Sequence, residues 1–128
     1  MLALTETRLH SNMPAAVKLD AAPPGYTIRH VHRSPTARHP LGGGIAVIHR
    51  DNLTVSAHPL SGSFRPSSFE LQLVRLAAAV PPLAVAVVYR PPDGSKVAFL
   101  DELSEFLFQL ASTSTDRILL CGDLNCPG

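Results

Sequence analysis

Residues 69–125 decide the fold: FELQLVRLAAAVPPLAVAVVYRPPDGSKVAFLDELSEFLFQLASTSTDRILLCGDLN. The segment 69–78 opens with alternating apolar and polar residues, which predicts a strand with one buried face. The segment 83–89 is a continuous apolar run, which is typical of a strand in the middle of a sheet. Because only a Pro81-Pro82 turn separates the two segments, we expect them to form an antiparallel pair.

A helix and another strand follow this pair. Leucines at helical spacing predict a helix over about 96–111, and Ser95 is its candidate N-cap. Residues 117–121 (RILLC) then predict a buried strand. Strands that enclose a helix in this way indicate the α/β class.

The segment before residue 69 is richer in strands and loops. It contains no internal repeat and no composition shift that would mark a domain boundary, and 128 residues suit one domain. Apolar and β-branched runs predict further strands at residues 2–5, 26–32, 44–49 and 53–57, and the first of these is expected to be buried.

Charge is distributed unevenly along the chain although the net charge is only +1. Residues 1–65 hold seven Lys or Arg against three acids, whereas residues 66–128 hold four against seven. A basic half suits a partner that carries phosphates. An ordinary solvated surface explains the same asymmetry equally well, so composition alone leaves both interpretations open.

Several classes of protein are disfavoured by the sequence. The two cysteines, Cys121 and Cys126, have neither zinc-knuckle spacing nor the density of a disulfide framework, so a reducing compartment is expected. The first residues do not form a signal peptide, since Glu6 and Arg8 interrupt them. The longest apolar run, 76–88, is too short to cross a bilayer, and we expect no membrane association.

Asp123 and Asn125 follow the last predicted strand, where catalytic groups are often found. Gly122 allows a tight turn, and residues two apart in an extended chain point to the same side. An Asp that handles water and an Asn that donates to a phosphorane are what phosphodiester hydrolysis requires. The same four residues, Gly-Asp-Leu-Asn, also suit an ordinary Asx turn, which is the commoner outcome.

Two other polar residues end apolar strands. Glu6 follows residues 2–5 and could ligate Mg²⁺, which prefers one or two carboxylates, although a solvated surface Glu is the commoner case. Tyr89 ends the strand 83–89, where it could hold a hydroxyl over a phosphate or simply cap the edge of the core.

Seven short segments occur in a characteristic order along the chain: TETR (5–8), PPGY (23–26), GGGIAVI (42–48), SFEL (68–71), VYRPP (88–92), FLDEL (99–103) and LLCGDLN (119–125). In this order they resemble the endonuclease domain of LINE-type (non-LTR, jockey-like) retrotransposons. That domain belongs to the endonuclease/exonuclease/phosphatase superfamily and is similar to apurinic/apyrimidinic endonucleases. The resemblance covers nearly all of residues 2–125, and the ordered set is more specific than any one segment.

The resemblance implies a role for each matching residue. Glu6 matches the metal-binding Glu of the family, with Mg²⁺ as cofactor and Mn²⁺ as an alternative. Tyr89 matches a Tyr near the scissile phosphate, Asp123 the Asp that handles the attacking water, and Asn125 the Asn that binds the phosphate. The family nicks target DNA in the nucleus to prime a reverse transcriptase domain of the same polyprotein, so both are the implied partners.

The implied fold is a four-layer α/β/β/α sandwich with mixed sheets, of which residues 1–128 would form an incomplete domain. The family's first strand and its closing S-D-H segment are not found in the sequence, and Arg8 stands where the family usually has Trp. Two alternatives therefore stay open: a catalytically dead remnant of such an element, and a phosphatase of the same fold. The chain by itself is expected to be inactive.

Overall fold

A computed structural model describes residues 1–5, 23–31, 44–92 and 94–125. This part of the chain forms a mixed α/β structure with two sheets and one α-helix. The strands are β1 (Leu2–Thr5), β2 (Tyr26–Val31), β3 (Ile45–Arg50), β4 (Val55–Ala57), β5 (Glu70–Leu76), β6 (Leu83–Tyr89) and β7 (Arg117–Asp123); the helices are the 3-10 turn η1 (Pro59–Gly62) and α2 (Lys96–Thr113). Every predicted strand and the predicted helix are present, with ends that differ by a few residues.

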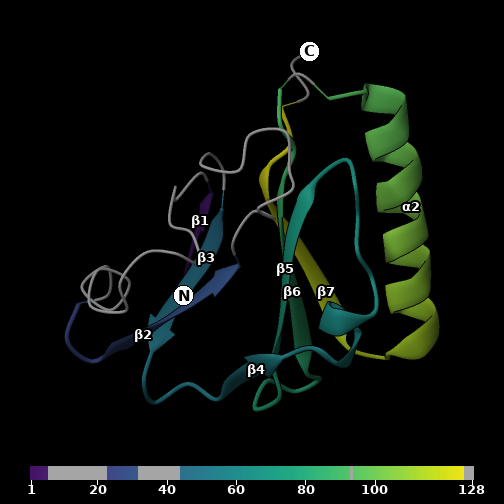
Figure 1. The fold of residues 1–128 in the computed structure, drawn as a ribbon. Coiled ribbons are helices and arrows are strands. Elements are labelled where there is room, and N and C mark those ends of the chain that lie inside the picture. Colours follow the sequence, from purple (N-terminus) through teal and green to yellow (C-terminus); the bar gives the residue numbers. More distant parts are fainter. Residues whose placement is uncertain (6–22, 32–43, 93, 126–128) are drawn as a thin grey trace.

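The two sheets face one another, and α2 covers the outer face of the larger sheet (Figure 1). The three-stranded sheet has the order β1-β3-β2 and is antiparallel throughout. The four-stranded sheet has the order β4-β5-β6-β7 and is mixed, because β6 pairs antiparallel with β5 and parallel with β7. The predicted antiparallel pair is therefore confirmed, and its second strand lies inside the sheet as its apolar sequence predicted.

Each face of the four-stranded sheet has its own core. The inner core lies between the sheets and includes Val47 on one side and Val85 and Val87 on the other. The outer core lies under α2, where Ala86 of β6 packs with Phe106 and Leu110 of the helix. Alternate residues of β6 thus serve opposite faces, which explains why its sequence is apolar without interruption.

Helix α2 forms where its sequence predicted it. The hydroxyl of Ser95 accepts a hydrogen bond of 3.2 Å from the amide of Ala98 and so caps the first turn. The helix buries Phe99, Phe106 and Leu110 along one stripe. Each such side chain contributes on the order of 1.5–3 kcal/mol by leaving water.

Two strands expected to be buried are partly exposed. In β7, Ile118 is 40% and Leu119 is 49% exposed, and in β1 Leu2 is 55% exposed. The reason is position, because β7 and β1 are the edge strands of their sheets among the described residues. An apolar run of four to seven residues cannot reveal whether a second neighbour covers the strand.

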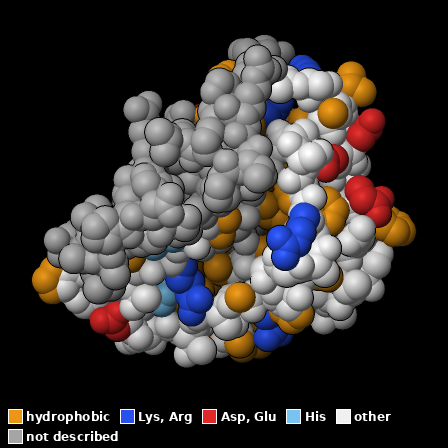
Figure 2. Space-filling view, viewed as in Figure 1, with side chains coloured by type: hydrophobic (Ala, Val, Ile, Leu, Met, Phe, Trp, Pro, Cys, Tyr) orange, Lys and Arg blue, Asp and Glu red, His pale blue; other side chains and the backbone are white. Residues whose placement is uncertain are grey.

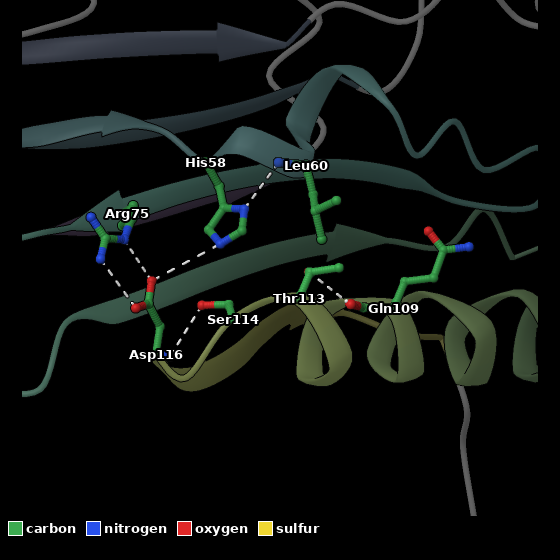
Figure 3. Close-up of polar contacts among 7 residues, drawn as sticks. All are labelled: His58, Leu60, Arg75, Gln109, Thr113, Ser114 and Asp116. Carbon is green, nitrogen blue, oxygen red and sulfur yellow. Dashed lines mark hydrogen bonds and ion pairs between the residues drawn. The ribbon is translucent and has the colours of Figure 1, made fainter.

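A polar cluster fixes the point where β7 begins (Figure 3). Arg75 of β5 donates from Nε to Oδ2 of Asp116 at 2.6 Å and from Nη2 to Oδ1 at 3.2 Å. This bidentate pair lowers the pKa of Asp116. His58 Nε2 lies 4.0 Å from the same carboxylate, while His58 Nδ1 accepts from the Leu60 amide at 3.1 Å. The residue before β7 is therefore tied to β5 and to the turn η1.

Candidate active site

Parallel pairing brings Tyr89 and Asp123 side by side. The two residues are register partners at the ends of β6 and β7, and Glu70 at the start of β5 is the partner of Tyr89 on the other side. Register partners share one face of a sheet. The ring of Tyr89 belongs to the inner core. Glu70, Tyr89 and Asp123 therefore form a row on the face that is turned toward the three-stranded sheet.

Gly122 makes this pairing feasible. Its φ is +128°, and a Cβ added there would overlap the carbonyl oxygen of Val88 and lie 2.8 Å from the nitrogen of Val88. The backbones of β6 and β7 thus approach more closely than any side chain at this position would permit. The sequence suggested glycine for a turn at this point, whereas the structure uses it for close strand contact.

Asp123 and Asn125 are joined by a tight turn. The amide N–H of Asn125 donates to Oδ1 of Asp123 at 3.1 Å, and Asn125 has a φ of 45°. Extended chain through Asn125 was therefore the wrong expectation: β7 ends at Asp123. The expected Asx turn forms, and it keeps both side chains at the same end of the sheet as Tyr89.

Arg90 stabilises this turn through several hydrogen bonds, although its place in the sequence did not indicate such a role. Its side chain is 5% exposed, and it donates to the carbonyl of Asn125 from Nη1 and to the carbonyl of Gly94 from Nη2, both at 2.6 Å. Its backbone N–H donates to the carbonyl of Asp123 at 2.9 Å. The guanidinium also lies 5.5 Å from the ring centroid of Phe99. The sequence signal for this role is a cationic residue directly after an apolar central strand, a place where its side chain becomes buried.

The Asn125 side chain completes the connection, because its Nδ2 donates to the carbonyl of Arg90 at 2.5 Å. Asn125 is thus bound to Arg90 in both directions, from carbonyl and from carboxamide. One donor of the carboxamide is used in this contact, and its second N–H and its oxygen remain the groups with which Asn125 can contact another molecule.

Glu70 links the two sheets at this same end. Its Oε1 accepts a hydrogen bond of 2.7 Å from the amide of Gly44, directly before β3. Thr5, the last residue of β1, pairs with Ile45. The end of β1 therefore lies at the end of the sandwich that holds Glu70. Glu70 was also not singled out from the sequence, although a charged residue on a core-facing position of β5 is the relevant signal.

The predicted metal ligand Glu6 lies outside the described residues. Those that are described supply two carboxylates at this end, Glu70 and Asp123, and carboxylate oxygens are what Mg²⁺ prefers. One strand, β6, separates them. Within the described ranges no group of three or more His, Cys, Asp or Glu residues comes together as a ready metal site.

Packing in the inner core fixes the position of Tyr89. It is only 4% exposed and packs in the inner cluster with Val87. The structure therefore brings three of the four predicted site residues, Tyr89, Asp123 and Asn125, to one end of the larger sheet.

Within the described part of the chain, no helix has both the length and the apolar character needed to cross a membrane. Searches with models of protein families and against curated proteins found no match to this sequence.

Proposed function

We propose that the chain is part of a Mg²⁺-dependent DNA endonuclease domain of the LINE-type retrotransposon family, which nicks target DNA by phosphodiester hydrolysis. The observation that carries the proposal is the parallel register of β6 and β7, which sets Asp123 beside Tyr89 with Asn125 two residues away. These are the residues that the resemblance matches to the family's phosphate site. The two facing sheets and α2 would be three layers of the family's four-layer sandwich.

In the proposed reaction Asp123 orients and deprotonates a water molecule for in-line attack on the phosphorus. The bond between phosphorus and the 3′-oxygen breaks, and that oxygen takes a proton from solvent to leave as the 3′-hydroxyl. The free carboxamide N–H of Asn125 and the hydroxyl of Tyr89 donate to the phosphate oxygens as charge develops there. Glu6 is the residue that would hold Mg²⁺, and the ion when bound would neutralise charge on the phosphate and on the leaving oxygen. Arg90 positions Asn125 through its contact with the Asn125 carbonyl.

The binding of DNA would come chiefly from phosphate contacts, so it should weaken as salt concentration rises. The implied partner of the same polyprotein is a reverse transcriptase domain that extends the 3′-hydroxyl of the nick. The reverse transcriptase partner rests on the resemblance. The binding of DNA rests on the resemblance and on the excess of Lys and Arg over acidic residues in residues 1–65.

The test is the nicking of supercoiled plasmid with Mg²⁺ and with EDTA. It compares the chain with a longer version that adds the family's first strand and S-D-H segment. The informative variant is Asp123→Asn, because an Asn oxygen can still accept the Asn125 N–H and keep the turn. It should lower nicking by roughly 100-fold or more, as expected for a lost general base. Asp101→Asn, on the exposed side of α2, is the matched control and should leave nicking unchanged.

Nicking by the longer version that disappears with EDTA and with Asp123→Asn supports the proposal. Nicking that survives Asp123→Asn would contradict the assigned role. A folded longer version that leaves DNA intact but releases phosphate from inositol phosphates would indicate the phosphatase alternative, and inactivity toward both substrates would indicate a dead remnant.

A further inference from the structure

Helix α2 exposes large apolar side chains on the side that faces away from the sheet. Val97 is 70%, Phe108 is 69% and Leu100 is 46% exposed. With about 3.6 residues per turn, Val97 and Phe108 point away from the side of the helix that buries Phe99 and Phe106. In Figure 2 hydrophobic and acidic side chains lie together along this exposed side of α2. The described part of the chain thus leaves a second apolar face of the helix open to solvent.

The spacing of this face reads the same from either end. The exposed residues Ser104 and Ala111 continue it, and we call Val97, Leu100, Ser104, Phe108 and Ala111 the outward stripe. Successive members are 3, 4, 4 and 3 residues apart, a spacing that keeps neighbours on one side of a helix. Two antiparallel copies of α2, related by a two-fold axis at Ser104, would pair Leu100 with Phe108 and Val97 with Ala111. A symmetric dimer requires such a self-complementary surface.

The sizes of the paired side chains suit close packing. The small Ser104 would meet its own copy at the axis, and the distance between packed helices depends on the side chains at their contact. On either side of the axis Leu100 would lie against Phe108, and the small Ala111 would lie against Val97. The outward stripe contains no charged residue, so the pairing would bury no unpaired charge.

The charges of α2 favour the antiparallel orientation. The last turn of the helix has no basic residue, although the carbonyl end of a helix attracts cations. In the antiparallel pair Lys96 of each copy would lie beside the last turn of the other copy. Asp101 and Glu105 lie on one flank of the outward stripe, where the acids of the two copies would approach one another. Salt screens this repulsion, so the pair should be tighter at high salt than at low salt.

We propose that the outward stripe binds a second copy of this chain in an antiparallel pair of α2 helices. The stripe is only about 21 Å long at a rise of about 1.5 Å per residue. Contacts that bury less than about 1,200 Å² are typical of weak and transient association, so the dimer forms only at high protein concentration. The row of Glu70, Tyr89 and Asp123 faces the other sheet, and the pairing therefore leaves the candidate active site uncovered.

The first test is sedimentation velocity over a concentration series of the wild-type chain, at low and at high salt. The sedimentation coefficient should rise with concentration toward that of a dimer, and more steeply at high salt. Phe108→Glu should weaken the association by roughly 10-fold or more, as expected for a central aromatic anchor. Val80→Glu is the matched control, because Val80 is 92% exposed and lies between β5 and β6, outside the stripe. It should associate as the wild-type chain does.

Two results of this test would overturn the proposal. A wild-type chain that stays monomeric at every concentration would leave the stripe for a partner of different sequence. Association that Phe108→Glu leaves unchanged would assign the contact to another surface, such as the open edge of β7 with its exposed Ile118 and Leu119.

The second test examines the antiparallel orientation by exchange of charge. Leu100→Lys and Phe108→Glu should each weaken self-association, and circular dichroism should show both variants folded because both positions are exposed. An equimolar mixture of the two variants should recover association, because the new ammonium of one chain would meet the new carboxylate of the other. No recovery in the mixture would refute the antiparallel pair. Neither test measures cleavage, so a dimer that never nicks DNA would support this inference while refuting the nuclease.

Discussion

The substitution Gly122→Ala should separate β7 from β6 and so dismantle the row that contains Tyr89 and Asp123. Gly122 has a φ of +128°, where a residue with a Cβ is strained by about 1–3 kcal/mol. The added methyl would also overlap the Val88 carbonyl and lie 2.8 Å from its nitrogen. Backbone cannot swing aside as a flexible side chain can, so part of the parallel ladder must break.

The two effects together should lower the free energy of unfolding by about 3 kcal/mol or more. This is a large share of the roughly 5–15 kcal/mol that stabilises a typical domain. Urea denaturation followed by circular dichroism measures the loss directly. Gly62→Ala is the matched control, because a Cβ at Gly62 meets nothing within 4 Å and its φ is not positive.

A loss below about 1 kcal/mol for Gly122→Ala, equal to that of the control, would refute the reasoning. It would mean that β7 can move away from β6 at little cost. The register that sets Asp123 beside Tyr89 would then be too weakly specified to support a catalytic arrangement.

Further predictions concern the core, the buried cation and pH. Phe106→Ala should lower the free energy of unfolding in urea by about 3–5 kcal/mol, because the ring is fully buried. Phe108→Ala, at a position that is 69% exposed, should lower it by less than about 0.5 kcal/mol. Arg90→Met removes two charge-assisted hydrogen bonds and should cost at least about 2 kcal/mol, while Arg65→Met on the surface should be neutral by the same measurement. Burial lowers the pKa of His58. The folded chain therefore takes up this proton less readily than the unfolded chain, and stability should fall as pH drops below about 6.5. His58→Gln should remove that part of the pH dependence in thermal melts at pH 5 to 8; an unchanged profile would contradict the assignment.

Most of the secondary structure was predictable because local signals agree with one another. The alternation in 69–78, the apolar run in 83–89 and the Pro81-Pro82 turn all favour one hairpin, and β5 and β6 form it. Helix α2 follows the leucine spacing and the Ser95 cap. Local pattern, capping and turn chemistry act within a few residues, so they can be recognised in the sequence alone.

The exposure of β1 and β7 was not predictable by the same means. Whether a strand is central or at an edge depends on which strand pairs with its far side, and that partner can lie anywhere in the chain. Ile118 and Leu119 look as buried in the sequence as Val85 and Val87 do, yet only the latter lie between two neighbouring strands. Period and hydrophobicity do not encode strand order.

The candidate site likewise combines features that are local in the sequence with contacts between distant segments. Asp123, Asn125 and Tyr89 were predicted as candidates because each lies at the end of an apolar strand or just after it, which is a local feature. Their assembly depends on β6 and β7 being parallel neighbours, a pairing across more than thirty residues. Arg90 and Glu70 were missed because their significance comes from what they contact, the Asn125 carbonyl and the Gly44 amide.

Arg90 connects the stability of the fold to the geometry of the candidate site. A buried guanidinium is costly unless its donors are paired, and two of its partners are the carbonyls of Asn125 and Gly94. The loop that carries Asn125 therefore cannot move freely without leaving a buried charge unpaired. A separate hydrogen bond uses one N–H of the Asn125 carboxamide, which donates to the Arg90 carbonyl. The proposed contact of Asn125 with a phosphate through its remaining N–H is thus compatible with an intact turn, and it would require no rearrangement of that turn.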